Sequence, residues 1–171
     1  MKGIACICFL FGCGGFGFFK INDYRRHYRE LVYIKYILNT MIIEMENHRG
    51  TFGETCFVLS QKVKKPYNEI FEGLYHLLEE ERSNTPERYW NEKMDILSKE
   101  LELLREEKEI LQGIIRCADS NTLSIPLEVL RQSLVEWDKV ILSAEKIKNE
   151  RSKVTLALSI TAGLILCITV L

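Results

Sequence analysis

The sequence predicts an all-α protein: an antiparallel bundle of five or six helices, with an N-terminal and a C-terminal transmembrane helix. Two observations lead to this prediction. Apolar residues recur at spacings of three and four through the middle of the chain, which is the helical period. Charged residues are missing from both ends, because apart from Lys2 every charge lies between Lys20 and Lys153. We therefore expect three parts: an N-terminal membrane helix at 1–19, a helical bundle at 20–153 and a C-terminal membrane helix at 154–171.

Both apolar runs are near the lower limit of length for a membrane helix. Residues 3–19 and 154–171 comprise about 17 and about 18 uncharged residues, against a hydrocarbon core of about 30 Å. The basic residues that follow the first run are Lys20, Arg25, Arg26 and Arg29, and those that precede the second are Lys146, Lys148, Arg151 and Lys153. By the positive-inside rule these flanks stay in the cytoplasm. We expect a two-pass protein of the cell membrane with a cytoplasmic bundle and both termini outside.

The first bundle helices are predicted from caps and prolines. The helix that leaves the N-terminal anchor ends near residues 47–50. Thr51 and Glu54 then form a T-x-x-E capping box that opens the second helix. Pro66 fits the first turn of a third helix. Each of these helices carries an apolar stripe along one face.

The second half of the bundle is less clearly divided. A fourth helix begins around Pro86, and whether 86–118 is one helix or two stays open: the leucine spacing favours one helix and Ser98 favours two. The last helix runs from about Thr122, with Pro126 tolerated in its first turn, into the C-terminal anchor. The expected core residues are Leu31, Ile34, Ile37, Leu38, Met41, Ile42, Met45, Phe52, Cys56, Leu59, Val63, Ile70, Phe71, Leu74, Leu77, Leu78, Trp90, Met94, Leu97, Leu101, Leu104, Leu111, Ile115, Val129, Leu130, Leu134, Trp137, Val140, Ile141 and Ile147.

The glycine-rich segment at 12–17, GCGGFG, matches the G-x-G-x-x-G pattern of dinucleotide-binding loops. A single long helical pattern follows it, where that fold needs a helix and then a second parallel strand. Lipid attachment at Cys13 is disfavoured as well, because it would place the bundle outside the cytoplasm. Small residues instead recur on one face of each anchor, where they would let the two membrane helices pack together as a hairpin; the alternative is that membrane helices simply contain many small residues. These candidate packing residues are Ala5, Cys8, Gly12 and Gly15 in the first run and Thr155, Ser159, Gly163 and Cys167 in the second.

Few residue patterns in the sequence indicate a catalytic or metal-binding site. Two pairs, Glu44 with His48 and Glu72 with His76, are spaced to share a helix face, but the further inward carboxylates of a di-metal bundle are missing. The six cysteines include no C-x-x-C pair, and no phosphate loop or nucleophile motif occurs. With 23 basic and 24 acidic residues, no overall charge favours nucleic acid. We predict no catalytic residue, cofactor or metal, and no nucleic-acid partner.

Taken together, several segments resemble the stage III sporulation protein AB family. These are the end of the first anchor at 15–20, the helix RELVYIKYILNTMIIEME, the segment KPYNEIF, Trp90 after a polar loop, KEIL at 108–111, Asp119, and the final anchor with Ala162 to Leu164. The family is similar to the cytoplasmic helical domain of type II secretion and type IV pilus platform proteins. The resemblance therefore implies a helical bundle held at a membrane.

The resemblance also implies a non-enzymatic role in the channel complex between mother cell and forespore. The implied partners are a secretion-type ATPase, stage III sporulation protein AA, docking from the mother-cell cytoplasm, other membrane proteins of the channel, and lipids. The candidate partner-binding residues are Glu44, Glu46, Glu100, Glu102, Glu106 and Glu107. The alternative is a membrane-tethered helical scaffold that self-associates into a homo-oligomer and has no ATPase partner.

Overall fold

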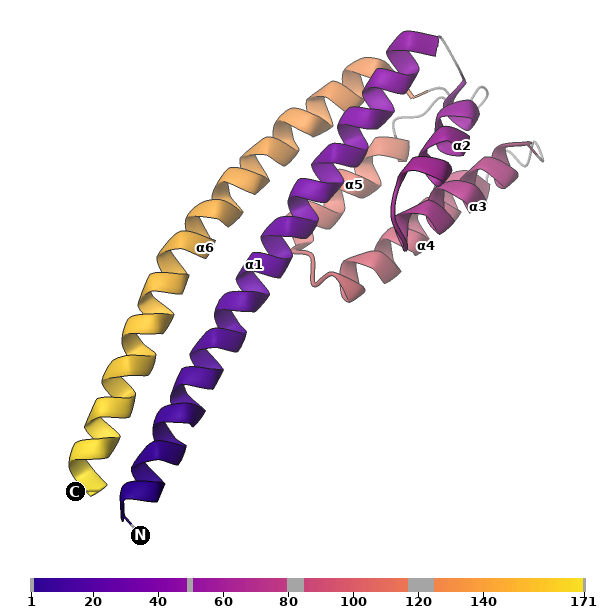
Figure 1. The fold of residues 1–171 in the computed structure, drawn as a ribbon. Coiled ribbons are helices and arrows are strands. Elements are labelled where there is room, and N and C mark those ends of the chain that lie inside the picture. Colours follow the sequence, from indigo (N-terminus) through magenta and orange to yellow (C-terminus); the bar gives the residue numbers. More distant parts are fainter. Residues whose placement is uncertain (1, 49–50, 80–84, 117–124, 171) are drawn as a thin grey trace. The chain divides into compact units, whose positions relative to one another are not determined.

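The computed structural model describes residues 2–48, 51–79, 85–116 and 125–170, which form helices and no strand (Figure 1). The helices are α1 (Lys2–His48), α2 (Phe52–Lys62), α3 (Tyr67–Glu79), α4 (Thr85–Glu100), α5 (Arg105–Arg116) and α6 (Leu127–Val170). Two compact units result: residues 1–30 with 141–171 make the first, and residues 31–140 make the second. The all-α prediction is confirmed.

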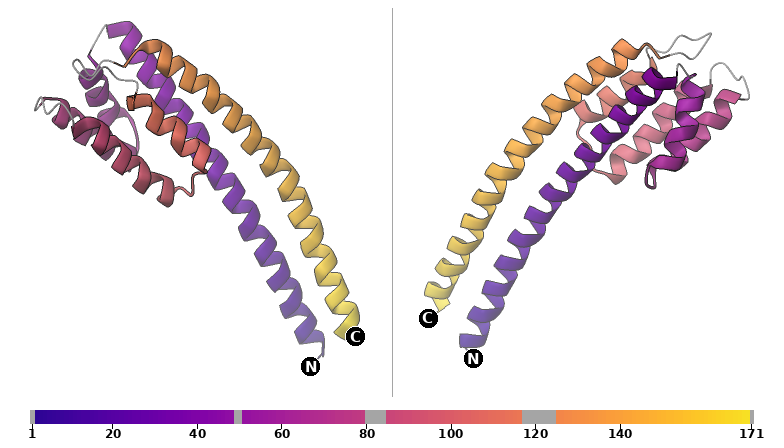
Figure 2. Two further views of the ribbon diagram at one scale, coloured as in Figure 1. Left: turned by 180° about the vertical axis from the view of Figure 1, so that it is seen from behind. Right: turned by 45° about the horizontal axis from the view of Figure 1, so that its top comes forward.

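The first unit consists of the start of α1 and the end of α6. The two segments run side by side in opposite directions (Figures 1 and 2). Lys148 joins them, because its Nζ atom lies 3.9 Å from the centre of the Tyr28 ring. Residues 12–17 are helical, which excludes a dinucleotide-binding loop at GCGGFG.

The membrane-spanning predictions concern this first unit. Over the part of the chain that the structure describes, no helix combines the length and the apolar character needed to cross a membrane. The two transmembrane helices therefore stay a prediction. Among the candidate packing residues, Thr155 is half-buried. The side chains of Ala5, Cys8, Gly12, Gly15, Ser159, Gly163 and Cys167 lie outside the described residues.

The second unit contains the hydrophobic core. Six of the seven apolar residues predicted to line α1 are buried there, and the seventh, Met45, is half-buried. The predicted inward residues of α2, among them the fully buried Cys56, are buried as well. Burial raises the pKa of the Cys56 thiol, because the thiolate would lose its hydration. The stripes on α1 and α2 were therefore read correctly from spacing alone.

Two tryptophans fix the helices of this unit to one another. Trp137 on α6 is fully buried, and its Nε1 donates a hydrogen bond of 2.9 Å to the Leu31 carbonyl of α1. Trp90 on α4 donates from Nε1 to the Leu111 carbonyl of α5 over 2.8 Å. A buried indole needs such an acceptor for its N–H. Both contacts join a large apolar side chain to the backbone of a neighbouring helix, which fixes the register of each pair.

The predicted start of α2 at the Thr51 cap is confirmed, whereas the predicted starts of α3 and α6 differ from the structure. Thr51 Oγ1 accepts from the Glu54 N–H over 3.3 Å, and Glu54 Oε2 accepts from the Thr51 N–H over 3.1 Å, which confirms the capping box. The placements of Pro66 and Pro126 within first turns were wrong, because α3 begins at Tyr67 and α6 at Leu127. Each proline precedes its helix by one residue, where its missing N–H costs no helical bond.

The question left open for 86–118 is answered by a break between α4 and α5. Ser98 lies inside α4 and does not start a helix; the break falls at residues 101–104, where Glu102 has a φ of 53°. The Leu103 N–H donates to the Ser98 carbonyl over 2.8 Å and closes the turn. Leu104, predicted as a core residue, is 58% exposed because it occupies this turn.

The remaining core predictions hold in part. Leu77, Leu78, Leu101, Val129, Leu134, Val140 and Ile141 are half-buried, and Ile147 is exposed. Ile114 and Ile125 are buried although the stripe pattern did not select them. A close helix contact adds to the core: Tyr89 on α4 covers Gly73 of α3, where a Cβ atom would collide with the tyrosine hydroxyl. Glycine at this position leaves room for the Tyr89 side chain between α3 and α4.

Candidate partner-binding surface

Glu44 was predicted to contact a partner, and the structure instead gives it a place inside the bundle. Its residue exposure is 8%, and its Oε1 lies 2.5 Å from Lys62 Nζ of α2. A nearly buried carboxylate is retained only with such a partner, because its desolvation is unfavourable. Glu44 therefore holds α2 against α1. No group of metal-binding side chains forms within the described ranges.

Glu107 was also predicted as a partner-binding residue, but the structure buries it. Only 1% of the residue is exposed, and its Oε2 accepts a hydrogen bond of 2.7 Å from the Leu104 N–H. The first N–H groups of a helix lack partners within the helix. Glu107 satisfies one at the start of α5, where a carboxylate is also favoured by the helix dipole. Its role is to fix the turn.

Glu46 is exposed but already engaged within the protein. Its Oε1 lies 2.5 Å from Arg131 on α6, and Arg131 also reaches Glu128 at 3.5 Å. The hydrogen bond that Arg131 donates to Glu46 raises the pKa of Arg131 above its usual value. A partner that bound Glu46 would have to compete with this ion pair. Exposed ion pairs of this kind contribute about 0–1 kcal/mol to stability.

Glu100, Glu102 and Glu106 are exposed and form no ion pair among the described residues. They lie at the end of α4, in the turn and at the start of α5. Two apolar side chains in the same segment are also exposed: Ile96 at 53% and Leu104 at 58%. We call these five residues the acidic turn. Unpaired carboxylates beside exposed apolar side chains are suited to contact a basic protein surface.

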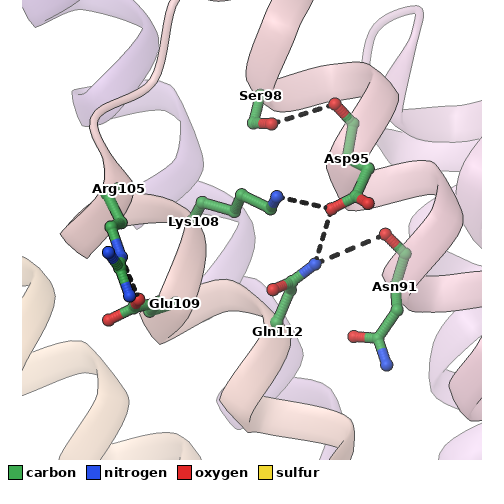
Figure 3. Close-up of polar contacts among 7 residues, drawn as sticks. All are labelled: Asn91, Asp95, Ser98, Arg105, Lys108, Glu109 and Gln112. Carbon is green, nitrogen blue, oxygen red and sulfur yellow. Dashed lines mark hydrogen bonds and ion pairs between the residues drawn. The ribbon is translucent and has the colours of Figure 1, made fainter.

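A polar network holds the two helices that carry the acidic turn (Figure 3). Asp95 Oδ1 of α4 accepts from Lys108 Nζ at 2.7 Å and from Gln112 Nε2 at 2.8 Å, both on α5. Gln112 Nε2 also approaches the Asn91 carbonyl at 3.5 Å. Together with the Trp90 hydrogen bond, these contacts fix α5 on α4. The acidic turn is therefore a surface of defined geometry.

This network predicts a pH dependence. The hydrogen bond from Lys108 lowers the pKa of Asp95 below its ordinary value. A carboxyl group with a lowered pKa stabilises the fold at pH values above its unfolded pKa, near 3.9, and that contribution is lost as the pH falls through the lower folded value. We expect Asp95→Asn to reduce stability at pH 7 and to flatten the loss of stability below about pH 4. Urea unfolding of the full chain in detergent at several pH values measures this.

The matched control is Glu92→Gln, since Glu92 is an exposed carboxylate of the same helix. It should leave the pH profile close to that of the unmodified chain. If Asp95→Asn and Glu92→Gln gave the same profile, the network would contribute nothing to the joining of α4 and α5.

Comparison with known proteins identifies the family of this chain. The sequence profile described as stage III sporulation protein AB matches residues 2–171. The chain belongs to the stage III sporulation protein AB family. No curated protein and no solved structure gives a significant match. The resemblance drawn from short segments is thus confirmed over residues 2–171, and membership of the family indicates a role in sporulation.

Proposed function

We propose that the chain is a non-enzymatic membrane platform of the sporulation channel between mother cell and forespore. In this proposal the apolar runs at 1–19 and 154–171 span the membrane, both termini lie outside, and the bundle faces the mother-cell cytoplasm. The bundle docks a secretion-type ATPase, stage III sporulation protein AA, beside other membrane proteins of the channel. Family membership and the basic flanks of both runs support this proposal.

The acidic turn is the observation that favours docking at a particular place. Glu100, Glu102 and Glu106 are exposed and form no ion pair among the described residues, while Glu44, Glu46 and Glu107 already contact other groups of the protein. A partner with a basic surface would gain charge complementarity at the acidic turn without breaking an existing ion pair. It would also cover Ile96 and Leu104. Such a contact needs no active site.

The test is binding of the full chain in detergent to the purified ATPase. We expect the triple variant Glu100→Lys, Glu102→Lys and Glu106→Lys to weaken binding by roughly tenfold or more, mainly through slower association and with an altered salt dependence. The control triple, Glu72→Lys, Glu87→Lys and Glu92→Lys, changes the net charge equally at exposed sites of α3 and α4. Docking at the acidic turn is refuted if both triples weaken binding alike, and the ATPase partnership is refuted if the unmodified chain does not bind.

A separate observation favours the self-associating scaffold as a second candidate. Val32, Tyr36 and Ile43 are 41%, 49% and 51% exposed on α1. Their spacings of four and seven place them on one helix face. A second copy could cover this face, as in helix pairs that share an apolar seam. Light scattering of the full chain in detergent decides: this candidate requires an oligomer that Val32→Glu with Ile43→Glu dissociates, and a monomer at all concentrations excludes it.

A further inference from the structure

The first unit contains a groove between the paired segments of α1 and α6. Its volume is about 730 Å³, within the range of about 300–1,000 Å³ that is typical of small-molecule sites. Arg25, Tyr28 and Arg29 line it from α1, and Lys148 and Lys153 line it from α6, together with amide and hydroxyl side chains. We call it the basic groove. No carboxylate is among the described residues that line it.

The cations of the basic groove are available for a ligand. Arg25, Arg29 and Lys153 are exposed, and the described part of the chain gives them no ion pair. Lys148 is half-buried and held over the Tyr28 ring at 3.9 Å, a cation–π contact that leaves its N–H groups free to donate. Glu150, on the same turn of α6, lies 4.0 Å from Lys146, and neither residue lines the groove.

The side chains of the groove suit a phosphate group. Two guanidinium groups offer planar, paired donors that match phosphate oxygens, and the lysines add point charges from the opposite helix. Asn22, Asn149 and Ser152 supply neutral donors in the same lining. Because like charges from α1 and α6 face one space, a bound anion would also relieve the repulsion between them. The groove therefore favours an anion that contacts both helices.

The position of the groove along the chain indicates the source of that anion. Asn22 follows the apolar run that ends at Phe19 by three residues, and Lys153 directly precedes the run that begins at Val154. In a chain inserted as proposed above, this level is the membrane surface, where lipid phosphates are concentrated. We infer that the basic groove binds the phosphate headgroup of an anionic phospholipid of the cytoplasmic leaflet and so joins α1 to α6. This inference rests on the membrane insertion in the proposed function.

The experiment compares lipid retention by the full chain. The protein is purified in a neutral detergent that contains equal amounts of phosphatidylglycerol and phosphatidylcholine with the same acyl chains, and native mass spectrometry counts each bound lipid. The variant carries Arg25→Gln, Arg29→Gln, Lys148→Gln and Lys153→Gln. The unmodified chain should prefer phosphatidylglycerol. Since each basic side chain near a membrane surface strengthens anionic-lipid binding about fivefold, the variant should lose at least about tenfold of this preference.

The control carries four equal charge changes in the second unit: Arg88→Gln, Lys99→Gln, Arg116→Gln and Lys139→Gln, all at exposed positions. It should keep the preference for phosphatidylglycerol. An equal loss of the phosphatidylglycerol preference in both variants would mean that the net charge of the chain alone causes it. An unchanged preference in the groove variant would mean that the lipid binds elsewhere. Either result overturns the inference.

Two further measurements separate the possible failures. Inorganic phosphate is added to the unmodified chain, and if millimolar phosphate displaces phosphatidylglycerol and binds as tightly, the ligand is a soluble anion and the lipid inference is overturned. Cell fractionation tests the membrane platform itself. A chain in the membrane fraction without lipid preference refutes only the basic groove as a lipid site, whereas a chain absent from that fraction refutes the proposed insertion.

Discussion

Replacing Trp137 with alanine is expected to lower the free energy of unfolding of the second unit by about 3–5 kcal/mol. The side chain is fully buried, so its removal leaves a large cavity between α6 and α1. Its hydrogen bond to the Leu31 carbonyl is lost as well. A loss of this size is a large part of the total stability of a small unit. Urea unfolding of the full chain in detergent, followed by circular dichroism, measures it.

The variant Trp137→Phe separates packing from hydrogen bonding. Phenylalanine keeps most of the apolar volume but cannot donate to Leu31, so the loss should be closer to about 1–2 kcal/mol. A matched surface change, Val135→Ala, removes an apolar side chain that is 58% exposed on the same helix. It should alter stability by less than about 0.5 kcal/mol. Similar losses in Trp137→Ala and Val135→Ala would contradict a core around Trp137.

Replacing Glu107 with alanine is expected to lower the free energy of unfolding by roughly 1.5–3 kcal/mol. The substitution removes the charged acceptor of the Leu104 N–H and leaves the first turn of α5 without its cap. Glu106→Ala is the matched control, because Glu106 is the exposed neighbour in the same turn. It should be neutral within about 0.5 kcal/mol. Urea unfolding measures the free energy of unfolding of both variants. Equal losses in Glu107→Ala and Glu106→Ala would contradict the buried position of Glu107.

The contrast between these two neighbours has a practical consequence for binding studies. A Glu107 variant that no longer bound a partner would not identify Glu107 as a contact, because the loss of the cap would disturb the whole acidic turn. Variants at Glu100, Glu102 and Glu106 leave the network of Asp95, Lys108 and Gln112 in place. They are therefore the positions at which a lost interaction can be assigned to the surface.

Local patterns predicted those parts of the fold that depend on near neighbours in the chain. The stripe from Leu31 to Ile42 and the capping box of Thr51 and Glu54 were both correct, since spacing and cap chemistry are local properties. The start of α6 was placed too early because Pro126 is compatible with the first turn of a helix as well as with the residue before it.

The break between α4 and α5 was harder to predict, because the sequence does not mark it. The turn at 101–104 contains no glycine or proline, and the leucine spacing continues through it. Leu104 therefore looked like a core residue, although the turn exposes it. The same turn directs Glu107 inward from a segment in which most neighbours are also charged. Composition could not distinguish Glu107 from Glu106, since only the start of α5 decides which of them is buried.

Contacts between distant residues decided the rest of the candidate surface. Glu46 and Arg131 are separated by 85 positions, and Glu44 and Lys62 by 18. Neither pair could be read from spacing, because each depends on how helices pack in the second unit. The predicted set of six carboxylates thus divides into three that stabilise the protein and three, at the acidic turn, that are free of ion pairs within the described residues. The resemblance to the family, in contrast, was drawn from short segments, and the match over residues 2–171 confirms it.

The fully buried thiol of Cys56 offers a means of following the protein at work. A thiol reacts with maleimide as the thiolate, and burial suppresses both the thiolate and the access of the reagent. In a chain whose other cysteines are replaced, labelling would therefore occur only when α2 detaches transiently from its neighbours. Its rate would report the frequency of such openings, and comparison with and without the proposed ATPase would show whether binding changes it. A platform that becomes more rigid on docking would label more slowly.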